Sequence, residues 1–238
     1  MKLAPSLMRA DFLNLEQVLQ DLESSEVEFV HIDLMDGHFA PTLGFPLRFI
    51  KLAKDRTRIP LDVHLLVEEP SRYASQMPLG PFDQISFHIE SAEQPTLQQT
   101  IEIFRQSGAR VGLALKPETS LQSLMPWIDQ VDTVLLLNIA PGAHSVSPNA
   151  TAFLRLQELK TLQRSRSPNF RIEIDGGVNT ETVGTFARLG ADILVCGSIV
   201  FNGKSIQKFM AYFVVKAKCQ EKLRKNYPMS VFSVESLI

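Results

Sequence analysis

The stretch VHIDLMDGHF, residues 30–39, places two histidines and two aspartates in and directly after a segment with the pattern of a buried strand. His31 and Asp33 are separated by one apolar residue, so both side chains of such a strand project from the same face. Burying a carboxylate costs several kcal/mol unless a cation or a set of hydrogen-bond donors compensates it. This composition therefore predicts a chemical site rather than a plain core strand.

Similar polar residues stand near the ends of three later strand-like segments. His64 lies inside LDVHLLV, and Asp175 ends FRIEID directly before two glycines. Where such strand ends converge, mixed nitrogen and oxygen ligation suits Zn²⁺, Mn²⁺, Co²⁺ or Fe²⁺ better than Ca²⁺. The predicted metal ligands are His31, Asp33, His64 and Asp175. The alternative is that backbone groups satisfy these side chains. For His88 and the nearby Glu90 we expect a supporting or structural role.

Two glycine-containing segments predict a second subsite beside the first. DGGV (175–178) and CGSIVFNG (196–203) follow the seventh and eighth strand-like segments. Glycines let the backbone approach a ligand closely, and backbone N–H groups of such loops bind phosphate in barrel proteins. We expect a phosphate group here; the alternative is that both segments are merely tight turns.

The elements that must position these residues alternate along the whole chain. The strand-like segments are 3–7, 28–34, 60–67, 82–89, 110–115, 132–139, 170–175 and 192–197. The helical patterns are 14–25, 46–55, 70–77, 96–108, 120–130, 149–163, 179–190 and one beginning near 204. Gly108 is expected to stop a helix, and Asn179 or Thr180 to cap one. Because near-continuous apolar strands are typical of covered parallel sheets, this order predicts a single (β/α)8 TIM barrel, with an open doubly wound sheet as the alternative.

The domain organisation follows from the short linkers. We expect one barrel domain over residues 1–225 and a C-terminal tail extension over 226–238. A basic segment precedes this tail, and its last residues are apolar. We expect the tail to pack on the barrel or on a neighbouring subunit, and binding to a membrane surface is the alternative.

Composition and charge restrict the function classes. Apolar residues make up 45% and charged residues 21% of the 238 residues, which suits a soluble domain with a substantial core. The net charge of -2 and a pI near 6.2 predict no binding to nucleic acid or to membranes. Two cysteines, Cys196 and Cys219, make no disulfide framework and fit a reducing compartment. Since neither a signal-peptide pattern nor a membrane-spanning run is found, we expect a cytoplasmic protein.

The chain resembles the ribulose-phosphate 3-epimerase family. The resemblance extends from Pro5 to about Phe201 and rests on PSLMRADF, HIDLMDGHF, LDVHLLVEEP, VGLALKPET, IEIDGGVN and GADILVCGSIVF. It implies a (β/α)8 barrel, one divalent metal ion per subunit, no organic cofactor and reversible inversion at C3 of a phosphorylated ketose. Because proteins of this family usually self-associate, it also implies a homo-oligomer.

The resemblance implies roles for individual residues. Asp33 would take the C3 proton and Asp175 would return one from the opposite face, through an enediolate that the metal stabilises. Both aspartates would bind the metal together with the two histidines, and the sulfur of Met35 would pack over the reaction centre. The substrate-binding residues that it implies are Ser6, His64, Gly142, Gly176, Gly177, Gly197 and Ser198.

The sequence departs from the family pattern mainly in the loop after the sixth strand. PGAHSVSPN (141–149) replaces a glycine-rich phosphate-covering loop, so His144 and Ser145 either donate hydrogen bonds to phosphate or face solvent. Leu66 and Leu137 replace two methionines. The acid, base and metal set is complete, so we expect interconversion of D-ribulose 5-phosphate and D-xylulose 5-phosphate. The alternatives are a 3-epimerase of a ketohexose 6-phosphate such as allulose 6-phosphate, a non-catalytic sugar-phosphate sensor, and a metal-dependent aldolase.

Overall fold

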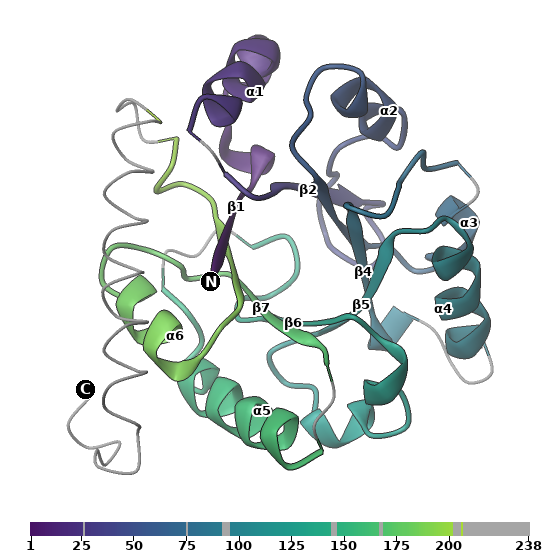
Figure 1. Ribbon diagram of the computed structural model, residues 1–238, viewed down its shortest axis with the longest axis vertical. Coiled ribbons are helices and arrows are strands. Elements are labelled where there is room, and N and C mark those ends of the chain that lie inside the picture. Colours follow the sequence, from purple (N-terminus) through teal and green to yellow (C-terminus); the bar gives the residue numbers. More distant parts are fainter. Residues whose placement is uncertain are drawn as a thin grey trace.

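Eight parallel strands form the centre of the molecule (Figure 1). The computed structural model describes residues 1–25, 27–74, 76–91, 96–143, 147–166, 169–201 and 206. The strands are β1 (Lys2–Pro5), β2 (Val30–Met35), β3 (Leu61–Leu66), β4 (Gln84–His88), β5 (Arg110–Leu115), β6 (Thr133–Leu137), β7 (Arg171–Asp175) and β8 (Ile193–Cys196). They are hydrogen-bonded in the order β1-β8-β7-β6-β5-β4-β3-β2, and a bridge between Ser6 and His31 brings β1 next to β2. The sheet is therefore a nearly closed barrel.

The helices lie around the outside of this barrel in chain order (Figure 1). Within the described ranges they are α1 (Leu15–Glu23), α2 (Arg48–Lys54), α3 (Ser71–Ala74), α4 (Thr96–Gln106), α5 (Ala152–Arg166) and α6 (Val183–Leu189). The predicted single (β/α)8 TIM barrel is confirmed. The helix predicted from near 204 lies, except for residue 206, outside the described residues. The predicted tail lies entirely outside them, so the division at residue 225 stays a prediction.

Apolar side chains fill the space between strands and helices. Every residue of β3 and of β4 is buried, as expected for parallel strands that are covered by helices. Leu22 of α1, Ile50 of α2 and Phe104 of α4 are buried in the same core. Burying one such side chain stabilises the fold by about 1.5–3 kcal/mol. Because this core immobilises the strands, polar side chains at their carboxyl ends have fixed positions.

The helix predicted over 120–130 is wrong. Two short 3₁₀ turns, η4 (Leu121–Leu124) and η5 (Ile128–Gln130), take its place. Pro126 explains the difference, because it has no N–H and its ring would clash with the carbonyl group of Gln122 in an α-helix. That carbonyl accepts a 3₁₀-type hydrogen bond from the N–H of Met125 instead.

The helix cap predicted at Asn179 is present one turn ahead of the bounds of α6, since the carbonyl oxygen of Asn179 accepts a hydrogen bond of 3.0 Å from the N–H of Val183. The residue before α6 is Thr182, whose side chain makes no capping hydrogen bond. The Asn179 Oδ1 atom accepts hydrogen bonds from the N–H groups of Glu181 and Thr182, as the side chain of an N-cap residue does. The predicted stop at Gly108 is confirmed, since α4 ends at Gln106 and Gly108 has a φ of 84°.

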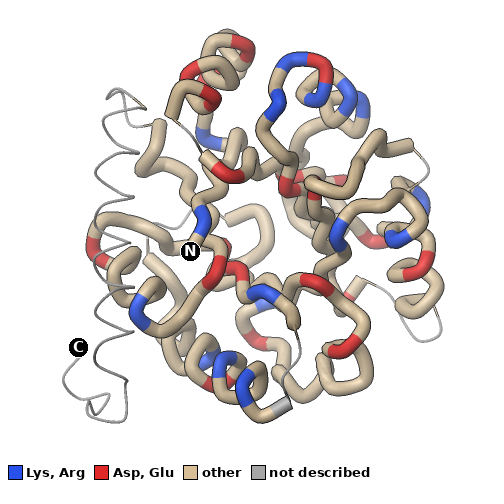
Figure 2. Tube along the Cα trace, viewed as in Figure 1, with Lys and Arg blue, Asp and Glu red and all other residues tan. Residues whose placement is uncertain are grey.

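Charged residues are distributed over the outer helices (Figure 2). Acidic residues mark α1 and basic residues mark α2 (Figure 2). An ion pair at 3.3 Å joins Arg56, after α2, to Glu16 of α1. Such exposed pairs contribute little to stability, about 0–1 kcal/mol. In the part of the chain that the structure describes, no helix has both the length and the apolar character needed to cross a bilayer.

Candidate active site

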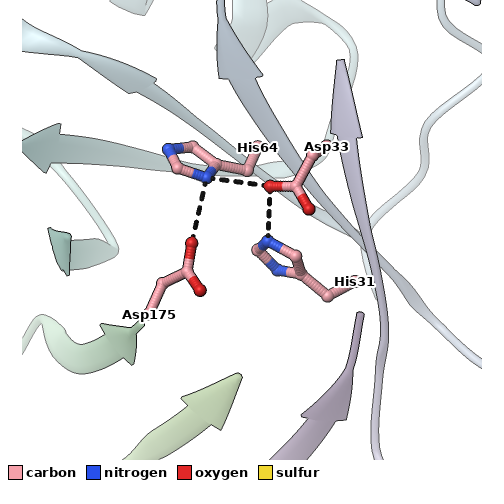
Figure 3. Close-up of side chains that lie close together, drawn as sticks. All are labelled: His31, Asp33, His64 and Asp175. Carbon is pink, nitrogen blue, oxygen red and sulfur yellow. Dashed lines mark hydrogen bonds and ion pairs between the residues drawn. The ribbon is translucent and has the colours of Figure 1, made fainter. Parts of the chain in front are cut away.

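The predicted metal ligands come from three strands and their side chains converge (Figure 3). His31 and Asp33 are two residues apart on β2, and the register pairs Asp33 with His64 on β3. Asp175 is the last residue of β7. The two histidines are completely buried, whereas the carboxylate of Asp175 is partly exposed. The period of two along each strand therefore turns all four side chains to the inside of the barrel.

The four side chains lie close enough to share one ion. The Nε2 atom of His31 is 3.1 Å from Oδ1 of Asp33, and the Nδ1 atom of His64 is 3.3 Å from the same oxygen. The Nδ1 atom of His64 is also 3.5 Å from Oδ2 of Asp175. One ligand atom of each residue lies within 4.8 Å of all the others. Two imidazole nitrogens and two carboxylate oxygens fit a divalent transition ion such as Zn²⁺, Mn²⁺, Co²⁺ or Fe²⁺.

The charges in this cluster depend on one another. Burial alone would raise the pKa of Asp33, but the imidazoles of His31 and His64 hold it well below its ordinary value. Burial would lower the pKa of both histidines, but the neighbouring carboxylates raise it instead. The carboxylates therefore require positive charge beside them, which protonated imidazoles or a bound divalent ion can supply.

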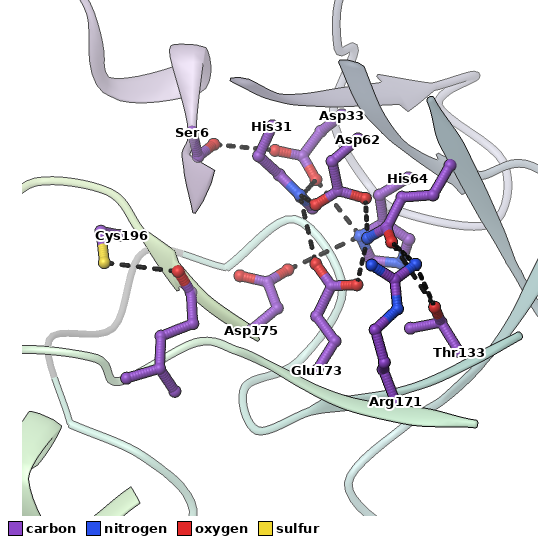
Figure 4. A network of polar contacts seen from close by, with 12 residues as sticks. Ser6, His31, Asp33, Asp62, His64, Thr133, Arg171, Glu173, Asp175 and Cys196 are labelled. Carbon is purple, nitrogen blue, oxygen red and sulfur yellow. Dashed lines mark hydrogen bonds and ion pairs between the residues drawn. The ribbon is translucent and has the colours of Figure 1, made fainter. Parts of the chain in front are cut away.

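A network of buried polar groups contacts the Nδ1 side of the His31 ring (Figure 4). The Nδ1 atom of His31 lies 2.6 Å from Oδ2 of Asp62. The amide of Gln84 donates to Asp62 and to Glu173, both at 2.7 Å, and Arg171 donates to the Gln84 carbonyl oxygen at 2.8 Å. Since its Nδ1–H is donated to Asp62, His31 presents Nε2 to Asp33 and the other predicted metal ligands.

A second group of ligand types, His31, Asp62 and Glu173, is also close enough to hold an ion. These three residues are completely buried, and none of them lines the pocket described below. Burial and the nearby carboxylate of Asp62 raise the pKa of Glu173 well above its ordinary value, which favours its neutral form. Because Gln84 already bridges the two carboxyl groups, we interpret this group as a hydrogen-bonded support rather than a metal site.

His88 and Glu90 lie behind His64. The Nε2 atoms of His88 and His64 are 3.0 Å apart, and Nδ1 of His88 is 3.1 Å from Oε2 of Glu90. Burial lowers the pKa of His88 to about 4. Burial would raise the pKa of Glu90, but hydrogen bonds from His88, Thr119 and the N–H of Lys116 lower it to about 2. At neutral pH a neutral imidazole therefore connects a carboxylate to His64.

A pocket opens over the cluster at the carboxyl ends of the strands. It encloses about 850 Å³, with the open solvent at its mouth included. Its lining contains these residues predicted from the sequence: Ser6, Asp33, Met35, Gly142, Asp175, Gly176, Gly177, Gly197 and Ser198. Leu66 and Leu137 line it as well, whereas His31, His64 and His88 are not part of the lining. The structure thus places the predicted acid–base residues and the predicted phosphate loops around one cavity.

The glycines after β7 are required by close packing. Gly177 has a φ of 70°, and a Cβ atom at this position would lie 2.2 Å from the backbone nitrogen of Pro148. A Cβ atom at Gly176, with a φ of 91°, would lie 2.8 Å from the side chain of Ile139. The loop after β7 therefore packs directly against the loop after β6. His144 and Ser145 of that second loop lie outside the described residues.

The sequence reasoning missed two kinds of residue. Asp62 and Glu173 each stand two residues before a predicted ligand on the same strand, so the period of two could have indicated them. Arg9 lines the pocket, and its Cγ atom lies 3.2 Å from the point where a Cβ atom of Gly197 would be. Arg9 belongs to the short turn η1 (Leu7–Arg9), which has no periodic pattern to indicate its direction.

Comparison with known proteins identifies the family. The model of the "Ribulose-phosphate 3 epimerase family" matches residues 2–201. The chain belongs to the ribulose-phosphate 3-epimerase family. A ribulose-phosphate 3-epimerase of Bacillus subtilis is 36% identical over 214 residues, which cover 87% of this chain and 94% of the relative. One of Treponema pallidum is 33% identical over 201 residues, which cover 84% and 91% of the two chains.

Membership of the ribulose-phosphate 3-epimerase family confirms the resemblance expected from the motifs and the expected enzyme class, an isomerase of the epimerase type. Solved structures with lower identity show the fold alone. KGPDC from Streptococcus mutans has a TM-score of 0.67 at 10% identity and covers 92% of this chain and 97% of its own. The 3-hexulose-6-phosphate synthase from Salmonella typhimurium has a TM-score of 0.64 at 14% identity, covering 92% and 100%.

Proposed function

We propose that this protein is a metal-dependent 3-epimerase that interconverts D-ribulose 5-phosphate and D-xylulose 5-phosphate. One observation carries the proposal: Asp33 on β2 and Asp175 on β7 line the same pocket, and both belong to a group of four side chains that fits a divalent ion. Curated relatives that cover most of the chain are named ribulose-phosphate 3-epimerases, which supports this substrate.

The reaction requires removal of a proton from the carbon next to a ketone. Asp33 acts as the base for one epimer, because His31 and His64 favour its ionised form. The proton passes to the Asp33 carboxylate, the C3–H electron pair forms the C2–C3 double bond of an enediolate, and the π pair of the C2 carbonyl moves onto its oxygen. Asp175 then donates a proton to C3 from the opposite face, which inverts the configuration. Re-formation of the C2 carbonyl returns the pair to C3 when C3 is protonated. Proton exchange with water resets both carboxyl groups, and the reverse reaction uses them in the opposite order.

The chain's own residues orient the base. The hydroxyl group of Ser6 donates a hydrogen bond of 3.0 Å to Oδ2 of Asp33, while Oδ1 faces the two imidazoles. The carboxylate is therefore held on both oxygens. His31, Asp33, His64 and Asp175 would hold the divalent ion, which when bound supplies Lewis-acid stabilisation of negative charge on the substrate oxygens.

Recognition of the phosphate group falls to the loops after β7 and β8. Gly176, Gly177, Gly197 and Ser198 line the pocket beside Arg9. Among the lining residues, Arg9 is the single cation, and it makes no ion pair with any residue that the structure describes. Guanidinium groups bind phosphate oxygens in a bidentate manner. We therefore assign Arg9 to the phosphate of the substrate, together with backbone N–H groups of the glycine loops.

Deuterium exchange tests the proposed function. The purified protein, loaded in turn with Zn²⁺, Mn²⁺, Co²⁺ or Fe²⁺, is incubated with ribulose 5-phosphate in D₂O, and deuterium at C3 is followed by NMR. We expect deuterated xylulose 5-phosphate, and loss of this product in Asp175→Asn. Asp129→Asn makes the same chemical change at an exposed position away from the pocket and should keep the activity.

Two other outcomes would overturn the proposed substrate or activity. Exchange with allulose 6-phosphate but not with ribulose 5-phosphate would indicate a ketohexose-phosphate epimerase. Metal and sugar-phosphate binding without exchange of either substrate would indicate a sensor. Light scattering on the same sample tests the predicted homo-oligomer.

A further inference from the structure

A chain of three side chains leads from the loop after β4 to the metal-ligand cluster. Glu90 belongs to the 3₁₀ turn η3 (Ile89–Ser91), His88 ends β4, and His64 is on the neighbouring strand β3. Oε2 of Glu90 faces Nδ1 of His88 at 3.1 Å, and Nε2 of His88 faces Nε2 of His64 at 3.0 Å. The other nitrogen of His64, Nδ1, faces Asp33 and Asp175.

The contact between the two Nε2 atoms allows only two arrangements. At 3.0 Å one nitrogen must donate a hydrogen to the other. The neutral imidazole of His88 carries one N–H, so the partner of its Nδ1 atom determines whether its Nε2 atom donates or accepts. Either His88 has its hydrogen on Nδ1 and accepts from His64, or it has its hydrogen on Nε2 and donates to His64.

Glu90 selects between these arrangements because a carboxylate only accepts hydrogen bonds. Its Oε1 atom accepts from the N–H of Lys116 at 2.8 Å and from the hydroxyl group of Thr119. Its Oε2 atom faces His88, so His88 must donate from Nδ1 and accept at Nε2. His64 then donates from Nε2, which leaves Nδ1 as the nitrogen that faces Asp33 and Asp175. In the metal-free cluster Nδ1 carries a hydrogen that these carboxylates accept, and a bound divalent ion would take the place of that hydrogen.

We propose that Glu90, acting through His88, fixes the tautomer of His64 so that Nδ1 is available as a metal ligand. This inference rests on the proposed function, because it assigns a task to residues around the proposed metal site. Neither His88 nor Glu90 lines the pocket, so both are positioning residues. The ring of His88 is itself held in place, since the Phe39 ring packs on it with centroids 4.7 Å apart.

The two predicted metal-ligand histidines therefore present different ring nitrogens to the metal site, because different groups accept their other N–H. His31 donates Nδ1–H directly to a carboxylate, Asp62, and presents Nε2. His64 donates Nε2–H to a neutral imidazole, and the carboxylate that orients it is one residue further away. Supporting groups of this kind typically change metal affinity by about 10- to 100-fold.

Glu90→Gln reverses the direction of the hydrogen bonds from residue 90 through His88 to His64, with almost no change in the shape of the side chain. The N–H of Lys116 needs an acceptor, so the carbonyl oxygen of the glutamine takes the place of Oε1 and its NH₂ group faces His88. Nδ1 of His88 must then accept, and Nε2 must donate to His64. That arrangement keeps the hydrogen of a neutral His64 on Nδ1, where the metal would bind. Glu118→Gln is the matched control, because it removes the same charge from an exposed position in the loop after β5.

Two measurements test the inference. Long-range ¹H–¹⁵N NMR of the metal-free protein reports which nitrogen of His88 carries the hydrogen, and competition with a chelator reports the Zn²⁺ affinity. We expect Nδ1–H in the wild type and in Glu118→Gln, and Nε2–H in Glu90→Gln. The Zn²⁺ affinity of Glu90→Gln should be lower by about 10- to 100-fold, whereas that of Glu118→Gln should match the wild type.

Two results would overturn the inference. One is Nε2–H on His88 of the wild type, a measurement that does not require any variant to fold. The other is a Glu90→Gln protein that folds like the wild type and binds Zn²⁺ equally well. A protein that shows the expected tautomers and Zn²⁺ affinities but no exchange of a ketose phosphate would contradict the proposed function and leave this inference supported.

Discussion

The two ends of the pocket are built from different kinds of structure. The proposed acid–base and metal-ligand end consists of strand residues such as Asp33 and His64, which the parallel register pairs with one another. The proposed phosphate end consists of loop residues that line the pocket, such as Gly177, Gly197 and Arg9. Strands inside a barrel fix side-chain positions, whereas loops tolerate changes of sequence. In the proposed function, the proton transfer is therefore assigned to the strand-built part of this site and phosphate recognition to the loop-built part.

The two ends also differ in how strongly their residues depend on one another. His31 and His64 have no exposed surface, and each contacts a carboxylate in the cluster and a second polar group behind it. Removing one member leaves another buried charge without its partner, which typically costs several kcal/mol. Arg9 at the phosphate end is partly exposed, and its guanidinium group makes no ion pair with the described residues. We therefore expect larger effects from changes at the strand-built end.

The largest effect is expected for Asp175→Asn. Inversion should slow by about 10²- to 10⁴-fold, because a general acid–base group is lost. Asp33 remains, so the variant should still exchange the C3 proton of one epimer with D₂O without inverting it. NMR of each epimer separately measures this asymmetry. Equal loss of exchange for both epimers would argue against a two-base reaction.

Metal removal should have the next largest effect. Dialysis against a chelator should lower kcat by about 100-fold or more, because a Lewis acid supplies several kcal/mol in reactions of this kind. Adding back Zn²⁺, Mn²⁺, Co²⁺ or Fe²⁺ one at a time should restore activity and raise the Tm, since a ligand that binds only the folded state stabilises it. Full activity of the chelated, metal-free protein would refute the predicted cofactor.

A substitution at the loop-built end tests the phosphate-binding role proposed for Arg9. Arg9→Gln should raise KM for a phosphorylated ketose by about 10- to 100-fold, because a charge-assisted hydrogen bond is worth about 1.5–3 kcal/mol. The kcat should change little, since Arg9 is not among the residues that contact the acid–base pair. Arg48→Gln, on the exposed side of α2, is the control. An unchanged KM would remove Arg9 from the phosphate subsite.

The contribution of Glu90, which lies behind the strand-built end, should make the free energy of unfolding depend on pH. The folded protein holds the pKa of Glu90 at about 2, against an ordinary value of 4.5, so the unfolded chain binds this proton more readily. The stabilisation by Glu90 is therefore complete above about pH 4.5 and is lost as the pH falls toward 2. Urea unfolding of the metal-free wild type and Glu90→Gln should show a difference that shrinks in this range. A difference that is constant down to pH 2 would contradict the assignment.

The smallest effects are expected for Leu66→Met and Leu137→Met. Both leucines line the pocket, and both are almost fully buried. Exchanging leucine for methionine conserves volume, so the free energy of unfolding should change by less than about 1.5 kcal/mol. Thermal unfolding and steady-state kinetics measure both effects. A large change in kcat would show that side-chain polarisability at these positions matters to the reaction.

Strand periodicity indicates the direction of a side chain at the strand-built end of the site, whereas the short turns at the loop-built end have no such period. His31, Asp33, His64 and Asp175 were predicted because strand periodicity shows which face a residue occupies. Arg9 was missed because a short 3₁₀ turn has no period that relates sequence position to direction. The helix expected over 120–130 was wrong because one proline outweighed a helical apolar pattern.

The sequence by itself determined the alternation of strands and helices, the face on which each polar strand residue lies, and the family. These properties depend on neighbours a few residues apart, so local patterns and motifs carry them. Only the tertiary structure decided that His64 faces His88, that Asp62 supports His31, and that Arg9 lines the pocket beside Gly197. Those contacts join segments far apart in the chain, and closure of the barrel brings them together.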